Sequence, residues 1–349
     1  MKKVTILIAT FNSMAVIGKT IAAIERQDYP RNMIEILIVD GGSTDGTIEF
    51  AKQHGCRVID NPMTEPVNAK LIGQREAGGD YILFVDHDEV MESKCSIRKK
   101  AWLLENYSDC HVVLGSGYKR PKDYPWINQY ISEYGDPFSL FLYDFPKGAG
   151  CFERLLKRNY KICKETKDYV IFDFGGSSRQ AIIELCCLGT MIDKTYFSKI
   201  PNAFDKGSVM THLFYIMLEK GDTMVAFSKK DSLLHYSADS IKAYFPKLKW
   251  RIVNNVHFKD MADSGVLGRI KHQKGMNLKK YLYLPYALFV LPATFHGIVL
   301  AIDRMNPAFL LHPVFSFYVA VEILIQYGRK LLGIPPVMKS YDGKKEIKR

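Results

Sequence analysis

The chain has 349 residues, of which 47% are hydrophobic, and it carries a formal net charge of +11. This composition excludes an intrinsically disordered protein, a collagen-like fibre and a small disulfide scaffold. The length accommodates one large domain or two ordinary ones. A basic excess is typical of proteins that bind nucleic acid or an anionic membrane, so its distribution along the chain is informative.

The positive charge lies in two short regions near the C-terminus. Residues 1–240 have a net charge of −1, residues 241–280 of +8, residues 281–328 of −1 and residues 329–349 of +5. A nucleic-acid enzyme would spread basic residues over its working domain, so we expect no nucleic-acid partner. The excess flanks a nearly uncharged segment instead, and this pattern indicates contact with anionic lipid.

Two further features concern the compartment. The seven cysteines are odd in number and contain no Cys-x-x-Cys spacing, which argues against a disulfide framework or a zinc ribbon and fits a reducing compartment. The apolar run near the N-terminus is only about five residues long, which predicts a buried strand rather than a signal peptide.

The first part of the chain alternates between short apolar strands and amphipathic helices. Strands are expected at residues 4–9, 35–39, 57–59 and 81–85, and helices at residues 14–26, 47–53 and 66–77. Continuous apolar strands that alternate with helices predict an α/β fold with a mostly parallel sheet covered on both faces. Ligands of such sheets bind beyond the carboxyl ends of the strands.

Acidic side chains follow the strand at residues 81–85 directly. Asp86 and Asp88 are separated by His87, so both carboxylates can turn toward one ion through the loop. Hard divalent cations take one or two carboxylates together with the phosphate oxygens of a substrate, and they neutralise a diphosphate leaving group. By itself, an Asp-x-Asp tripeptide is more often a solvated loop without metal.

The motifs in their order resemble the family 2 glycosyltransferases, enzymes with a GT-A fold that use nucleotide-diphosphate sugars. The resemblance covers residues 3–90 and rests on four segments in sequence: residues 8–13, residues 38–47, residues 69–82 and residues 86–88. It implies a Rossmann-like, mostly parallel sheet and a nucleotide-sugar donor. It also implies transfer with inversion of the anomeric centre.

The resemblance assigns roles to particular residues. Thr10, Asn12 and Asp40 would line the pocket for the base and the ribose, although Asp40 can also cap the following glycine turn. Lys70 stands where the family usually has arginine and could contact the diphosphate, or it could be a solvated helix lysine. We place His87 with these donor-binding residues.

The same resemblance implies the metal site. Asp86 would serve both the nucleotide sugar and the metal, and Asp88 would bind Mn²⁺ or Mg²⁺. His235 stands at the end of an expected strand, where many members have a histidine that joins the metal or the diphosphate. Imidazole suits Mn²⁺ better than Mg²⁺. A packed core histidine is the alternative for His235.

The general base is not evident. At the register where the family has an acidic pair, this chain has Val209 and Met210. Either Asp205 or His212 removes the acceptor proton, or no base is needed, because an ionised phosphate acceptor is already a nucleophile. The last possibility fits a polyprenyl-phosphate acceptor.

The C-terminal part contains two apolar segments, residues 281–302 and residues 305–328, which are each long enough to cross a bilayer. Their basic flanks predict a hairpin with both ends in the cytoplasm. Helices that lie in the membrane interface and helices packed in a soluble domain are the alternatives.

The sequence is thus divided into five parts. These are a nucleotide-sugar half at 1–115, an acceptor half at 116–240, basic amphipathic helices at 241–280, a membrane hairpin at 281–328 and a basic tail at 329–349.

The predicted protein is an inverting glycosyltransferase of the cell membrane, with its catalytic domain in the cytoplasm and a lipid-linked or envelope-glycan acceptor. A nucleotidyltransferase on a related fold is one alternative, but residues 9–12 lack the glycine-rich basic loop it would need. A non-catalytic membrane scaffold is the other, and the missing acidic pair is its best support.

Overall fold

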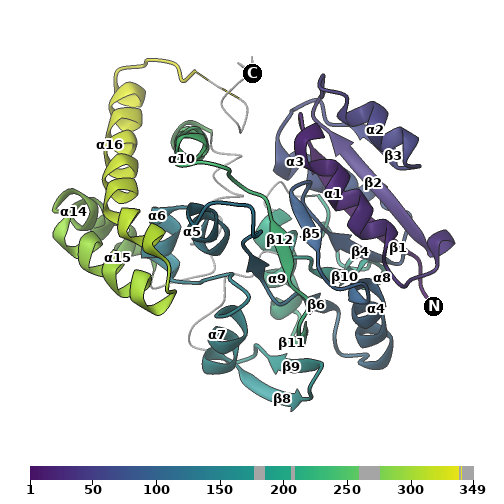
Figure 1. Cartoon of the computed structure of the whole chain (residues 1–349). Helices are drawn as coiled ribbons and strands as arrows, with labels where there is room; N and C mark the ends of the chain where they lie inside the picture. Colours follow the sequence, from purple (N-terminus) through teal and green to yellow (C-terminus); the bar gives the residue numbers. More distant parts are fainter. Residues whose placement is uncertain (177–184, 206–208, 259–275, 338, 340–349) are drawn as a thin grey trace. The chain divides into compact units, whose positions relative to one another are not determined.

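The computed structural model describes residues 1–176, 185–205, 209–258, 276–337 and 339 (Figure 1). The chain divides into two compact units. Unit 1 comprises Met1–Lys119 and Lys147–His235, and unit 2 comprises Arg120–Pro146 and Tyr236–Arg349. This division differs from the five expected segments, because the loop and helices after Lys119 group with the C-terminal helices. Parts of both predicted basic segments, residues 259–275 and 340–349, lie outside the described residues.

A nine-stranded sheet forms the centre of unit 1 among the described residues, in the order β3-β2-β1-β4-β10-β6-β11-β9-β8. Its strands are β1 (Val4–Thr10), β2 (Ile34–Asp40), β3 (Arg57–Asp60), β4 (Tyr81–Phe84), β6 (Val112–Leu114), β8 (Lys161–Glu165), β9 (Tyr169–Asp173), β10 (Met191–Asp193) and β11 (Met224–Ser228). Strands β3, β2, β1 and β4 are parallel, whereas β10 and β9 run antiparallel to their neighbours. The predicted α/β fold with a largely parallel sheet is confirmed.

A smaller sheet of unit 1 has the order β5-β12-β7, with β5 (Glu89–Met91), β12 (Leu233–His235) and β7 (Tyr118–Lys119). The helices of unit 1 are α1 (Met14–Glu25), η1 (Arg31–Met33), α2 (Thr47–Gln53), α3 (Pro66–Glu76), α4 (Ser96–Asn106), α7 (Phe152–Asn159), α8 (Lys194–Phe197) and α9 (Val209–Glu219).

The first four strands and three helices occupy the positions predicted from the sequence. Every residue of β1 and β4 is buried, which explains their unbroken apolar character. Helix α3 packs against β1 and β2 at Gly73, where a Cβ atom would lie 2.0 Å from Leu7 Cδ1. A side chain at this position would collide with the buried Leu7, so the close approach of α3 to β1 favours glycine here.

Unit 2 is helical. Its elements are α5 (Ile127–Tyr134), α6 (Pro137–Tyr143), α10 (Ile241–His257), α13 (Met276–Lys279), η2 (Lys280–Leu282), α14 (Tyr283–Leu288), α15 (Leu291–Asp303), η3 (Pro307–Leu311) and α16 (His312–Leu331). Their core is aromatic, and Tyr130 lies at its centre, with ring-centroid distances of 5.2 Å to Phe309 and 5.5 Å to Phe315.

The two predicted apolar segments differ in shape. The second forms a helix, Pro307–Leu331, which is long and apolar enough to cross a membrane. The first bends by 92° between Lys280–Leu288 and Leu291–Asp303. Val290 has a φ of +60° at the bend and Pro292 lies in the first turn of α15, where its missing N–H does no harm. The first segment is therefore two short helices rather than one straight span.

Candidate active site

The carboxyl ends of β1 and β2 are joined through Asp40, which is 1% exposed. Its Oδ2 accepts hydrogen bonds from Thr10 Oγ1 at 2.6 Å and from Ser43 Oγ at 2.6 Å. Its Oδ1 accepts from the backbone N–H groups of Gly42 at 2.9 Å and of Ser43 at 2.7 Å. A carboxylate offers about four lone-pair positions, and these four bonds use them. Asp40 thus caps the glycine turn, which the sequence predicted as the alternative to a ligand-binding role. The hydrogen bond from Thr10 holds the Asp40 carboxylate in place.

Asn12 connects the loop after β1 to the loop after β2. It has a φ of +47°, a conformation that asparagine tolerates better than most residues. Its backbone N–H donates to Ser43 Oγ at 2.8 Å, and its Oδ1 accepts from the N–H of Thr44 at 2.9 Å. Asp45 accepts from the N–H groups of Met14 and Thr47, which ties the starts of α1 and α2 together. The two loops therefore form one rigid edge.

Lys70 and Asp86 meet at the end of β4. Lys70 is carried by α3, and its Nζ lies 2.8 Å from Asp86 Oδ1 and donates to the carbonyl oxygen of Cys186 at 2.7 Å. The residue is only 5% exposed, so the interpretation as a solvated helix lysine is wrong. Burial by itself lowers the pKa of an ammonium group, but the Asp86 carboxylate outweighs it, and the pKa of Lys70 is raised. Lys70 is therefore a fixed positive charge.

Asp88 and His235 form a second pair in unit 1. Asp88 Oδ2 lies 3.5 Å from His235 Nε2, and the two side chains are 13% and 15% exposed. The imidazole stacks on the ring of Tyr118 with a centroid distance of 4.4 Å. Strand β12 lies between β5 and β7, and this pairing brings His235 next to residues more than a hundred positions earlier.

Both the side chain and the backbone of His87 contact neighbouring elements. Its Nδ1 lies 3.3 Å from the carbonyl oxygen of Ala9, and its own carbonyl accepts from Thr20 Oγ1 at 2.7 Å. These bonds tie the acidic loop to β1 and α1. The donor-binding role predicted for His87 stays a prediction.

The sequence reasoning overlooked Glu89, which is completely buried. Its Oε2 accepts from the N–H of Asp86 at 3.0 Å, and its Oε1 accepts from the hydroxyl of Tyr118. Burial, followed by the nearby Asp86 charge, raises the pKa of Glu89 to about 7. The available signal was an acidic residue at the start of an apolar strand, directly after the Asp-x-Asp motif.

The two predicted candidates for a general base lie in different surroundings. The side chain of Asp205 is 63% exposed and lies 3.5 Å from Nη2 of Arg75, near the end of α3. His212 is partly buried in α9. The catalytic roles of Asp205 and His212 stay predictions.

The family implies a divalent metal, and the donor groups fit it in part. Among the described residues, no group of three or more Asp, Glu, His or Cys side chains could hold one ion. Asp88 and His235 supply one oxygen and one nitrogen side by side, a pair that Mn²⁺ accepts. Asp86 Oδ1 is already occupied by Lys70, so Asp86 could reach an ion only through its other oxygen. The predicted metal roles of Asp86, Asp88 and His235 stay predictions.

The chain belongs to glycosyl transferase family 2, because the sequence profile of that family matches residues 5–179, half of its length. This confirms the predicted class of protein. Curated relatives match over shorter stretches. One is the poly(ribitol-phosphate) beta-N-acetylglucosaminyltransferase TarS of Staphylococcus aureus, with 24% identity over 34% of this chain and 22% of the relative.

A second relative, from Methanococcus voltae, is a dolichyl N-acetyl-alpha-D-glucosaminyl phosphate 3-beta-D-2,3-diacetamido-2,3-dideoxy-beta-D-glucuronosyltransferase. It is 37% identical over 25% of this chain and 30% of its own length. The match thus spans less than a third of either relative. Among solved structures, a TarS fragment in complex with UDP covers 95% of this chain and 92% of its own, with 14% identity and a TM-score of 0.48.

Proposed function

We propose that this chain transfers a sugar from a nucleotide-diphosphate sugar to a lipid-linked or envelope-glycan acceptor. Its membership of glycosyl transferase family 2 supports this proposal. The observation that carries it is the Lys70–Asp86 ion pair at the carboxyl edge of β1, β2 and β4, where ligands of parallel sheets bind.

The proposed reaction is one in-line displacement. An acceptor oxygen attacks the anomeric carbon, the bond from that carbon to the diphosphate oxygen breaks, and the nucleoside diphosphate leaves with the electron pair. The Lys70 ammonium stabilises the charge that develops on this leaving group, because it is fixed and shielded from water. Thr10, Asn12 and Asp40 form the rigid edge beside which the nucleoside would lie.

A bound metal would add to the same charge stabilisation. Asp88 and His235 would hold Mn²⁺ or Mg²⁺, and diphosphate oxygens and water would complete the coordination. When bound, the ion neutralises charge on the diphosphate.

The acceptor is proposed to carry a phosphate. The names of the two relatives support this, since one refers to poly(ribitol-phosphate) and the other to a dolichyl-linked sugar phosphate. Where the attacking oxygen belongs to the ionised phosphate itself, no general base is required. This agrees with the position of Asp205, which is exposed and paired with Arg75.

The experiment is a panel of UDP- and GDP-sugars with the purified full chain and Mn²⁺, with and without a polyprenyl phosphate. We expect one donor to release nucleoside diphosphate only when the acceptor is present. Asp88→Asn should lower this rate by roughly 100-fold, whereas Asp109→Asn, an exposed loop carboxylate, should leave it unchanged. Release of pyrophosphate when UTP or GTP and a sugar 1-phosphate replace the donor would indicate a nucleotidyltransferase, and no release under either condition would support the scaffold alternative.

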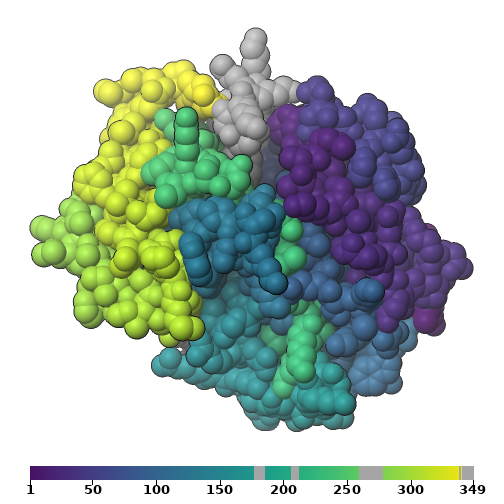
Figure 2. All heavy atoms as spheres, viewed as in Figure 1, coloured from purple at the N-terminus to yellow at the C-terminus, as the bar shows by residue number. Residues whose placement is uncertain are grey.

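We also propose that unit 2 binds anionic membranes. Exposed apolar residues recur on α15 at helical spacing, namely Leu291, Phe295, Ile298, Val299 and Ile302, which are 43–79% exposed. Such a stripe on one face is typical of a helix in contact with lipid. The surface of α15 and α16 is coloured yellow-green to yellow in Figure 2. Arg329 and Lys330 lie in the last turn of α16, where they would meet anionic head groups.

Co-sedimentation with phosphatidylglycerol vesicles tests this membrane proposal. The triple variant Leu291→Asp, Phe295→Asp and Ile302→Asp should lose most of the binding, because charges in the apolar region are costly. Ile162→Asp on the exposed strand β8 is the matched control. Equal binding by both variants would contradict the proposal.

A further inference from the structure

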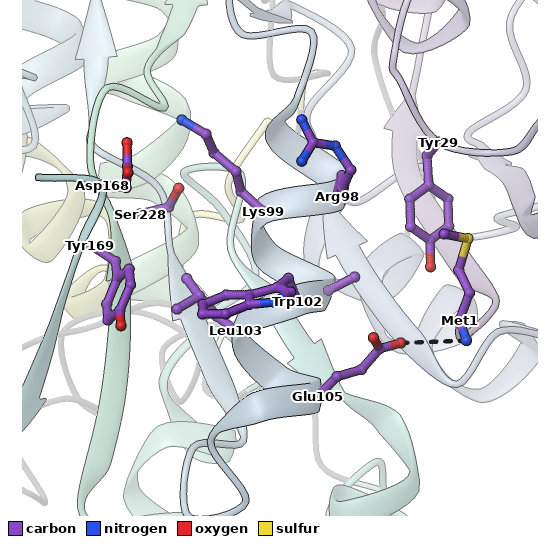
Figure 3. A pocket seen from close by; sticks show the side chains of 11 residues that line it. Met1, Tyr29, Arg98, Lys99, Trp102, Leu103, Glu105, Asp168, Tyr169 and Ser228 are labelled. Atoms are coloured by element: carbon purple, nitrogen blue, oxygen red, sulfur yellow. Dashed lines mark ion pairs between the residues drawn. The ribbon is translucent and has the colours of Figure 1, made fainter. Parts of the chain in front are cut away.

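Unit 1 contains a pocket whose lining includes none of the residues of the candidate active site. It has a volume of about 510 Å³ and is lined by residues of α4 together with Met1, Tyr29, Asp168, Tyr169 and Ser228 (Figure 3). Met1 lies three residues before the start of β1, whereas Thr10 is at its end. Seven strand residues separate the two ends by roughly 20 Å. On its other side the pocket reaches Ser228 at the end of β11, which lies four strands from β1 in the sheet, so the pocket is separate from the donor edge.

An exposed tryptophan forms one wall of this pocket. Trp102 on α4 is 46% exposed, although it is a large aromatic side chain in the middle of a helix. Its ring packs beside Tyr107 and Tyr169, with centroid distances of 6.3 Å and 5.9 Å, which hold its orientation. In Figure 3 the indole ring of Trp102 lies along helix α4 and borders the pocket. It offers a flat apolar surface of fixed orientation.

Polar groups without a partner lie around this surface. Ser228 is completely buried, and its Oγ has no hydrogen-bond partner among the described residues, although the residue lines the pocket. A buried hydroxyl left unpaired is costly, so a ligand that bonds to it gains affinity. No ion pair is recorded within the described part of the chain for Lys99 or Asp168, whose side chains also line the pocket.

The charges of the pocket balance. Arg98 is paired with Asp28 at 2.8 Å, and Glu105 lies 3.8 Å from the terminal ammonium of Met1 (Figure 3). The remaining charges are one cation, Lys99, and one anion, Asp168. A phosphate-bearing ligand would require a positive excess, and an acyl chain would leave the polar groups unpaired.

From this arrangement we propose that the pocket binds a neutral carbohydrate, with one face of a sugar ring packed on Trp102. The sugar hydroxyls donate to Asp168 and accept from Lys99, and one of them pairs with Ser228 Oγ. Pockets that combine an aromatic surface with a few convergent polar groups bind small ligands in this way. The site would hold a glycan chain away from the place of transfer. Carbohydrate binding at this pocket does not depend on the proposed transfer activity.

Titration of the full chain with cellobiose, maltose and N,N′-diacetylchitobiose, followed by calorimetry, tests the proposal. We expect at least one disaccharide to bind, with affinity reduced at least tenfold in Trp102→Ala. The control is Trp126→Ala, which removes a tryptophan of unit 2 with a similar exposed fraction, 51% against 46%, and should leave binding unchanged. Ser228→Ala should also weaken binding, while UDP affinity stays constant in every variant.

Two results would overturn the proposal. One is the absence of binding to all three disaccharides by the wild-type chain, and the other is equal affinity of Trp102→Ala and the wild type. If Trp102→Ala does not fold, judged by circular dichroism, the double variant Lys99→Met and Asp168→Asn replaces it, because both side chains lie at the pocket and neither has an ion pair with another described residue. Loss of UDP binding with sugar binding retained would contradict only the proposed function.

Discussion

Lys70 Nζ and Asp86 Oδ1 are 2.8 Å apart, and the pair has one buried and one accessible side. The lysine side chain is 7% exposed and the aspartate side chain is 31% exposed. The ammonium is therefore held in place by the protein, through Asp86 and the carbonyl oxygen of Cys186, while the carboxylate reaches the surface. The accessible member of the pair is thus the Asp86 carboxylate, and the Lys70 ammonium lies directly behind it.

Lys70→Met should lower kcat/KM for the donor by about 100-fold, or roughly 2.7 kcal/mol of transition-state stabilisation. The reason is the loss of the cation that stabilises the leaving diphosphate in the proposed reaction. Lys70→Arg keeps the charge and should retain more activity. Steady-state kinetics with the identified donor provide the measurement. Unchanged kcat/KM in Lys70→Met would contradict the role of the pair.

Gly73→Ala should destabilise unit 1 by about 1–3 kcal/mol, because the new methyl group meets the side chain of Leu7, which is 2% exposed and would have to rearrange within the packed core. Gly18→Ala is the matched control. In α1 its Cβ would lie 3.4 Å from the ring of Phe50, an ordinary contact, and alanine favours the helix by about 1 kcal/mol. Urea unfolding measures both changes. Equal stability of the two variants would show that α3 does not need the close approach.

Lys100→Met should cost about 3–5 kcal/mol of stability, since it leaves a buried carboxylate without its partner. Lys100 Nζ lies 2.5 Å from Asp231 Oδ2, and both side chains are at most 1% exposed. The control is Lys157→Met, which removes a partly exposed ion pair with Glu165 and should cost much less stability, because solvent screens such a pair. Adding Asp231→Leu to Lys100→Met should restore much of the loss. A double variant as unstable as the single one would contradict this explanation.

Glu35→Gln should destabilise the protein near neutral pH and much less in acid. Burial by itself raises the pKa of Glu35, but hydrogen bonds from the Thr5 hydroxyl, the Gly78 N–H and Arg57 outweigh it and lower the pKa below its ordinary value of 4.5. The folded carboxylate thus stabilises the protein above pH 4.5, and this contribution is lost as the pH falls through the folded pKa.

The measurement for Glu35 is the unfolding free energy of the wild type and Glu35→Gln between pH 7 and pH 3. The difference between them should shrink as the pH falls below about 4.5. A difference that stays constant over this range would show that the carboxylate charge is not what the hydrogen bonds stabilise.

The secondary structure of the first ninety residues is determined by the local pattern of apolar and polar residues. The apolar runs of β1, β2 and β4 are buried on both faces, so their sequence is nearly continuous in hydrophobicity, and the helices between them show regular spacing. The turn at Asp40 is local as well, since its N–H donors come from Gly42 and Ser43. These features could be predicted because cause and effect lie within a few residues.

The chemical character of the site required the tertiary structure. Lys70 has the sequence context of an exposed helix residue. Its burial is possible because its ammonium donates a hydrogen bond to the carbonyl oxygen of Cys186, 116 positions away. Glu89 is buried because Tyr118 reaches it from another strand. The bend at Val290 likewise divides a segment that is apolar enough to span a membrane. Sequence spacing predicts which face of a helix or strand is apolar. Only the tertiary structure determines which polar groups from distant parts of the chain lie beside a given side chain.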